Sequence, residues 1–79
     1  IFELFEKQKG LCALFNQPMT MITDRGIQAT NISIDRIDPT RGYTPDNIQL
    51  VQTQANWMKS NMTMSELVSR CRAVLAIHG

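Results

Sequence analysis

The chain has 79 residues and a mass of 9.0 kDa, which leaves room for one domain and excludes a second independent core. Apolar residues make up 43% of the sequence and charged residues 19%, a globular composition that argues against intrinsic disorder. The formal net charge of +1 excludes the strong basic excess by which many proteins hold nucleic acid through phosphate neutralisation alone.

The N-terminal part of the chain predicts one short helix followed by loops. Residues 2–9 mix apolar and charged side chains in an amphipathic pattern that Gly10 ends. Residues 11–15 form an apolar run, which is compatible with a short strand or with an extended segment that enters a turn. Residues 19–31 are polar and mixed, so we expect a loop there.

The central part predicts two strands joined by an ordered connection. Residues 32–38 alternate in polarity, which indicates a half-buried strand that ends at Pro39. Residues 39–47 are rich in turn-forming side chains. Residues 48–51 form a second apolar segment that we interpret as the partner strand.

Two helices are expected after the second strand. Residues 52–59 have a helix-compatible composition. The last helix is signalled by Thr63 and Glu66, whose spacing of three residues is typical of a capping box. Apolar side chains then recur at helical spacing from Leu67 to Leu75, so this helix should pack against the rest of the domain.

The two cysteines, Cys12 and Cys71, stand in apolar contexts and are expected to be buried, reduced thiols in a cytoplasmic protein. With one histidine, His78, at the C-terminal end, they cannot supply the four ligands of a zinc site, so no structural zinc is expected. No apolar run approaches the roughly 18 residues of a membrane span. Because the sequence opens on Ile1 in helical sequence, we expect one domain over residues 1–79, as a piece of a longer chain.

One motif carries chemistry. The string IDRIDPTRGYTPDNIQLV, followed by QTQANWMK, resembles the HNH endonuclease family. The family pattern is an acidic residue and a His on a strand, an Asn in a Gly-containing loop, and an Asn or His on the next helix with a Lys one turn later. The matching positions here are Asp35, Arg36, Asn47, Asn56 and Lys59. The tight part of the resemblance covers about a third of the chain.

The resemblance implies an α+β fold, a small ββα-metal module with flanking N- and C-terminal helices, and a metal-dependent DNA endonuclease in a bacterial or phage-encoded protein. It implies one Mg²⁺ or Mn²⁺ held by Asp35 and Asn56, with water and a phosphate in the remaining positions. The catalytic set would be Asp35, Arg36, Asn47 and Asn56. Asn47 would hold the loop through bonds from its side chain to the backbone. The residues expected to contact substrate phosphates are Arg36, Arg41 and Lys59.

The sequence departs from the family pattern at the general base. Arg36 stands where the family has its first His, and a guanidinium does not give up its proton in the accessible pH range. Asp38, Tyr43 or a metal-bound water remain as alternative bases. An inactive nucleic-acid-binding or assembly module of the same shape is the alternative function, and a small helical interaction domain is a third interpretation.

A second departure concerns zinc. Many members of the family carry two C-x-x-C pairs, whereas here Cys12 stands alone, with Phe15, Gln52 and Ala55 at the companion positions. We therefore expect apolar packing in place of the zinc staple. The residues expected to supply it are Leu11, Cys12, Leu14, Ile34, Leu50, Val51, Trp57 and the last helix. The near-neutral charge predicts that much of the grip on DNA comes from other domains of the same chain or from a partner protein. The resemblance implies that these also provide the specificity, and no membrane partner is expected.

Overall fold

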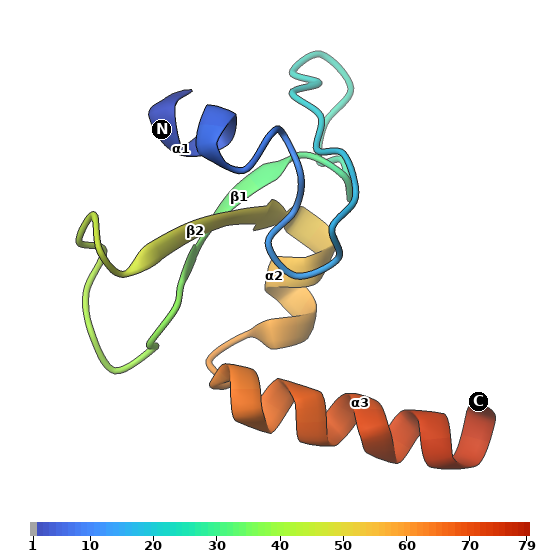
Figure 1. Cartoon of the computed structure of the whole chain (residues 1–79). Helices are drawn as coiled ribbons and strands as arrows, with labels where there is room; N and C mark the ends of the chain where they lie inside the picture. The colour runs from blue at the N-terminus through green and yellow to red at the C-terminus, as the bar shows by residue number, and fades with distance from the viewer. Residues whose placement is uncertain (1) are drawn as a thin grey trace.

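A two-stranded antiparallel sheet, followed directly by a helix, forms the centre of the molecule (Figure 1). The structure is a computed structural model and describes residues 2–79. In chain order the elements are α1 (Phe2–Lys7), β1 (Ile32–Arg36), β2 (Ile48–Gln52), α2 (Thr53–Lys59) and α3 (Met64–His78). The α+β class predicted from the sequence is confirmed, and the order strand, strand, helix is that of a ββα unit.

The register of the sheet sets which side chains face each other. Asp35 pairs with Gln49, and Arg36 pairs with Ile48 at the end of the ladder. Strand β1 ends at Arg36, two residues earlier than the alternation predicted. A two-stranded sheet is marginally stable by itself, so both α2 and the N-terminal segment are needed to cover it.

The core lies on β2, where Leu50 and Val51 are fully buried. The remaining buried core residues are Cys12, Met19 and Ala55, with Leu4, Phe5, Leu14, Phe15, Ile32 and Ile34 packed against them. The prediction that Cys12, Leu50 and Val51 are core residues is therefore confirmed. The prediction for Trp57 is wrong: its side chain is 57% exposed, because the buried positions of the short helix α2 are Ala55 and Lys59.

Hydrogen bonds, as well as apolar packing, join the N-terminal segment to the sheet. The Gln8 side chain donates to the carbonyl of Leu50 at 2.9 Å and accepts from its N–H at 3.0 Å, so it continues the ladder along the edge of β2. The Cys12 sulfur accepts the backbone N–H of Gln52 at 3.2 Å. Residues 11–15 form no strand but a turn closed by an isolated bridge between Leu11 and Pro18.

The loop before β1 supports the start of α2. The backbone N–H groups of Thr53 and Gln54 donate to the carbonyls of Asn31 and Ala29, at 2.8 and 2.9 Å. The first N–H groups of a helix have no partner within the helix, and Gln52 supplies no side-chain cap. The loop of residues 20–31 thus satisfies the donors of α2 and fixes this helix against the sheet.

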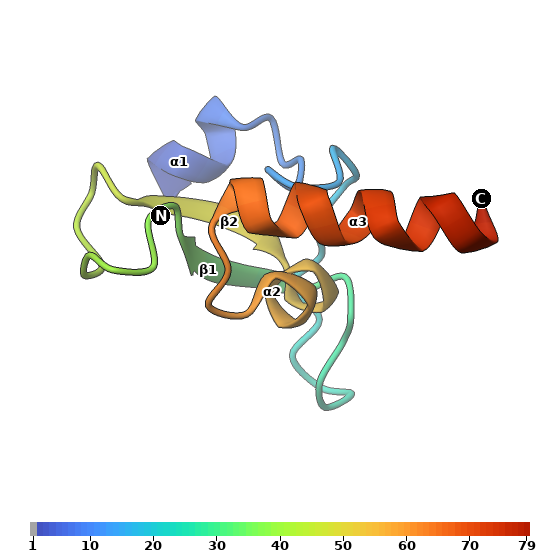
Figure 2. The same ribbon diagram turned by 90° about the horizontal axis from the view of Figure 1, so that it is seen from below.

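Helix α3 extends away from the sheet (Figures 1 and 2). Its start is the predicted capping box, with Thr63 and Glu66 each accepting a backbone N–H of the other. Of its side chains only Leu67 is buried, and Cys71, predicted to be buried, is exposed. The radius of gyration of 13.2 Å exceeds the value of about 12 Å typical of a compact chain of this length. No helix in residues 2–79 has the length and apolar character needed to cross a membrane.

Candidate functional site

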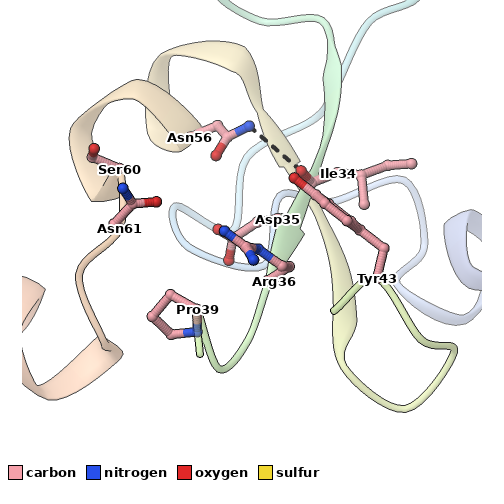
Figure 3. A pocket seen from close by; sticks show the side chains of 8 residues that line it. All are labelled: Ile34, Asp35, Arg36, Pro39, Tyr43, Asn56, Ser60 and Asn61. Carbon is pink, nitrogen blue, oxygen red and sulfur yellow. Dashed lines mark hydrogen bonds between the residues drawn. The ribbon is translucent and has the colours of Figure 1, made fainter. Parts of the chain in front are cut away.

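A polar pocket of about 160 Å³ lies between β1, the loop that follows it and the C-terminal end of α2. Figure 3 shows Asn56, Ser60 and Asn61 on one side and Tyr43 on the other, with Asp35 and Arg36 between them. The lining residues are Ile34, Asp35, Arg36, Pro39, Tyr43, Asn56, Ser60 and Asn61. The fold therefore brings together three of the predicted site residues, Asp35, Arg36 and Asn56.

Asp35 is the carboxylate of the pocket, and both of its oxygens have partners. Oδ1 lies 3.1 Å from the ammonium nitrogen of Lys59, and Oδ2 accepts a hydrogen bond of 2.9 Å from the side chain of Gln49, its neighbour across the sheet. The residue is only 3% exposed. A carboxylate offers about four lone-pair positions, so these two contacts leave acceptor capacity on a residue that lines the pocket.

Lys59 lies under the sheet and not at its surface. Its side chain is 0% exposed, and its ammonium also donates to the carbonyl of Arg36 at 2.8 Å. Helix α2 packs against β1, and Lys59, about one turn after Asn56, also reaches this strand, where it meets Asp35. A lysine in this position stabilises Asp35 and has no exposed surface with which to contact a phosphate.

The Asn56 side chain is oriented by β1. Its amide nitrogen donates to the hydroxyl of Ser33 at 2.6 Å and lies 3.5 Å from the carbonyl of Ile34. Within residues 2–79, the amide oxygen accepts no hydrogen bond. The amide oxygen of Asn56 is therefore free to bind a ligand in the pocket.

Arg36 is held at the mouth of the pocket by two contacts. One N–H of its guanidinium donates to the carbonyl of Arg41 at 3.2 Å, and the guanidinium carbon lies 5.2 Å from the centre of the Tyr43 ring, within the range of a cation–π contact. A guanidinium has five N–H donors, so most of them stay available. Arg36 can hold an anion there but cannot act as a base.

Asn47 organises the loop between the strands. Its side-chain oxygen accepts the N–H of Asp38 at 2.9 Å, and its amide nitrogen donates to the carbonyls of Asp38 and Gly42 at 3.1 and 2.9 Å. The residue is buried. The structural role expected for Asn47 is thus visible in the contacts, and this side chain shapes the pocket without lining it.

Arg41 lies outside the pocket lining. Its guanidinium donates to Asp46 at 2.7 Å in an exposed ion pair. The hydroxyl of Thr44, which donates to the same carboxylate at 2.6 Å, and then Arg41 itself lower the pKa of Asp46 to about 2. In the structure Arg41 pairs with Asp46 and so helps to fix the loop, and its expected contact with substrate stays a prediction.

The donors that face the pocket determine which metal ion it could hold. Asp35 and Asn56 offer one carboxylate and one free amide oxygen, the ligand type of Mg²⁺ or Mn²⁺, which keep several waters when bound. Within residues 2–79 no group of three or more His, Cys, Asp or Glu side chains gathers. The donor set therefore fits one hard divalent ion, and because Lys59 offsets the charge of Asp35, such an ion would be held weakly.

The alternative bases differ in their position. Tyr43 lines the pocket, whereas Asp38 does not. The pKa of Asp38 is lowered because the hydroxyl and the N–H of Thr40 donate to its carboxylate. The histidine, His78, lies at the far end of α3 (Figure 1). No imidazole from the described part of the chain reaches the pocket.

Two lining residues, Ser60 and Asn61, were missed by the sequence analysis. They follow α2 directly, beyond the end of the motif. Ser60 has a φ of 50° and a ψ of −127°, a conformation with positive φ that residues other than glycine adopt at a cost. This turn folds the chain back against the pocket, and a serine gives no sequence signal for it. No family model, curated protein or solved structure matches the chain.

Proposed function

We propose that this chain is a metal-dependent phosphodiesterase module that cuts DNA. The observation that carries the proposal is the meeting of three side chains, Asp35, Arg36 and Asn56, in one polar pocket. Two oxygen donors for a divalent ion stand beside a guanidinium that can hold a phosphate. Each is fixed by its own contacts with the fold, which favours a preorganised site.

The chain's own residues would divide the work of the reaction. Arg36 would bind a phosphate oxygen and stabilise the negative charge that grows in the transition state. Asp35 and Asn56 would hold the divalent ion, whose charge would stabilise the leaving oxygen. Since no side chain of the pocket is a base suited to neutral pH, the proton of the attacking water would pass to solvent at the open side.

Plasmid nicking tests this function. The chain is incubated with supercoiled plasmid and with Mg²⁺ or Mn²⁺, and the rate of nicking is compared with that of Asp35→Asn and Asn56→Ala. Matched controls are Asp24→Asn in an exposed loop and Gln54→Ala, an exposed residue of the same helix as Asn56. We expect each site variant to lose about 100-fold or more in rate, the scale for removing one group that stabilises transition-state charge, and the controls to match the parent chain. The proposal would be contradicted if Asp35→Asn and Asn56→Ala both nick plasmid at the rate of the parent chain. It would also be contradicted if the parent chain stays inactive at concentrations high enough to offset weak DNA binding.

A specific observation favours a second candidate, a nucleic-acid-binding or assembly module without activity. The ammonium of Lys59 already compensates the charge of Asp35, and Arg36 replaces the base. Calorimetry with Mn²⁺ separates the two functions. A phosphodiesterase should bind Mn²⁺ and lose that binding in Asp35→Asn, whereas a binding module should show no heat of Mn²⁺ binding that depends on Asp35.

The charge of the chain bears on its partners. With a net charge of +1 it can make few phosphate contacts, so we propose that further domains of the same chain or a partner protein provide most of the grip on DNA. The free thiols Cys12 and Cys71 are compatible with the reducing cytoplasm of a bacterial cell.

A further inference from the structure

Tyr43 is an exposed aromatic residue at the rim of the pocket. Its side chain is 69% exposed, although it lines the same pocket as Arg36 and Asn56. The Arg36 guanidinium lies over the ring at 5.2 Å from its centre, and most of the remaining ring surface is open to solvent. Exposing so much of an aromatic ring forgoes the stabilisation that its burial would bring, which suggests that the ring is placed for a ligand.

The loop that carries Tyr43 is held by hydrogen bonds on both sides of the ring. On the N-terminal side of Tyr43, the Asn47 side chain binds the backbone of Asp38 and Gly42. On the C-terminal side, the carboxylate of Asp46 accepts hydrogen bonds from Thr44 and Arg41. A side chain on a fixed loop loses little conformational entropy when it binds, so Tyr43 is a preorganised contact surface.

The chemistry around the ring selects the ligand. A planar aromatic face stacks well on another planar ring, and every nucleobase offers one. The adjacent guanidinium of Arg36 has free N–H donors for a phosphate. A ligand that stacks on the Tyr43 ring and also binds the Arg36 guanidinium must carry a base next to a phosphate. A nucleotide within a strand has this arrangement.

We propose that Tyr43 is a base-stacking subsite and that the substrate carries an unpaired nucleobase beside the phosphate bound by Arg36. This inference rests on the proposed function. In a duplex the faces of each base are covered by its neighbours, so a protein ring can stack only on a base that is unpaired, flipped out or at a strand end. The preferred substrate class is therefore single-stranded DNA, or a junction of single and double strand.

Binding without metal tests the subsite separately from cleavage. Fluorescence anisotropy in EDTA gives the affinity for a labelled single-stranded oligonucleotide and for the duplex of the same sequence. The variants are Tyr43→Ala and Tyr43→Phe, and Phe2→Ala, an exposed aromatic residue on α1, is the matched control. Circular dichroism and thermal unfolding verify that each variant is folded.

A stacked base contributes about 1–3 kcal/mol, which corresponds to about 5- to 150-fold in affinity. We expect Tyr43→Ala to lose that factor on the single strand and less than about twofold on the duplex, while Tyr43→Phe and Phe2→Ala match the parent chain. Absence of single-strand binding by the parent chain would overturn the inference. So would an unchanged affinity in Tyr43→Ala, or an equal loss on both oligonucleotides.

Failure of the inference and failure of the proposed function give different results. If the parent chain cuts plasmid but Tyr43→Ala binds the single strand normally, the subsite is wrong and the phosphodiesterase stands. If the parent chain cuts no plasmid with either metal and Tyr43→Ala still loses affinity for the single strand only, the base-stacking subsite stands and the phosphodiesterase is wrong.

Discussion

The ammonium of Lys59 lies 3.1 Å from Oδ1 of Asp35, and both side chains are buried. The pair joins the end of α2 to β1 near the C-terminal end of the strand, and the carbonyl of Arg36 accepts a second bond from the same ammonium. The residue at the centre of the candidate site is thus also part of the structural connection between helix and sheet.

Replacement of Lys59 should therefore unfold much of the protein. In Lys59→Met the Asp35 carboxylate stays buried without its counter-charge, which costs about 3–5 kcal/mol. Domains of this kind have about 5–15 kcal/mol of stability in total. Urea unfolding followed by circular dichroism measures the loss, with Lys7→Met, an exposed residue of α1, as the control.

The double variant Asp35→Asn, Lys59→Met removes both charges and should recover most of the stability that the single lysine variant loses, because no unpaired charge remains. A single variant as stable as the parent chain, or a double variant less stable than Lys59→Met, would show that the pair does not act as described.

The central fold could be predicted from the sequence because its signals are local. Alternation in polarity marks β1, although the strand ends at Arg36 and not at Pro39, and the capping box at Thr63 and Glu66 marks the start of α3. The resemblance of the motif also implied that Asp35 and Asn56 share one site, and both line the same pocket. In each case the sequence signal lies within a few residues of the element that it predicts, or in the number of residues between two elements.

The burial of individual side chains could not be predicted in the same way. Lys59 was expected to contact a substrate phosphate, but the structure buries it in an ion pair with Asp35. Lysine is almost never buried unless it is paired, and this pairing depends on how α2 packs against β1. Cys71 has the helical spacing of a core residue, yet α3 leaves the domain after its first turns and exposes it. The lining residues Ser60 and Asn61 depend on a backbone turn that has no sequence signal.

Asn47→Ala should loosen the loop between the strands. The substitution removes three hydrogen bonds and leaves the N–H of Asp38 and the carbonyl of Gly42 without these partners, at a cost of about 1–3 kcal/mol. Hydrogen exchange at the Asp38 amide should accelerate, and the urea midpoint should fall. Gln28→Ala, which removes one exposed bond, should change stability by less than about 0.5 kcal/mol. If Asp38 stays protected in Asn47→Ala, the loop is held by something else.

Thr63→Ala should destabilise α3, although Thr63 is only partly buried. The side chain of Thr63 accepts the N–H of Glu66, and the substitution breaks the reciprocal capping box, worth about 0.5–2 kcal/mol. Since only Leu67 of this helix is buried, packing cannot compensate, and helicity measured by circular dichroism should fall. The control is Ser65→Ala, a change at an exposed residue two positions after Thr63. Equal helicity in the two variants would exclude a role for the cap.

Acid should loosen the Tyr43 loop through Asp46. Its pKa is lowered from the ordinary value of 3.8 to about 2, first by the hydrogen bond from the Thr44 hydroxyl and then by that from Arg41. A carboxyl group whose pKa is lowered by folding contributes stability above its unfolded pKa, and the contribution is lost as pH falls through the folded pKa. The loop contacts should therefore persist at pH 4 and above and weaken toward pH 2. Carbon-detected NMR titration of the Asp46 carboxyl should give a midpoint near 2.

Thr44→Val is the variant that tests the cause. It removes the largest contribution to the lowered pKa of Asp46, so the midpoint should move up toward 3.8 and the loop should loosen at a higher pH than in the parent chain. Thr30→Val, a change in the separate loop before β1, should leave the midpoint where it was. An Asp46 midpoint that does not respond to Thr44→Val would mean that the hydroxyl is not the group that holds this carboxylate.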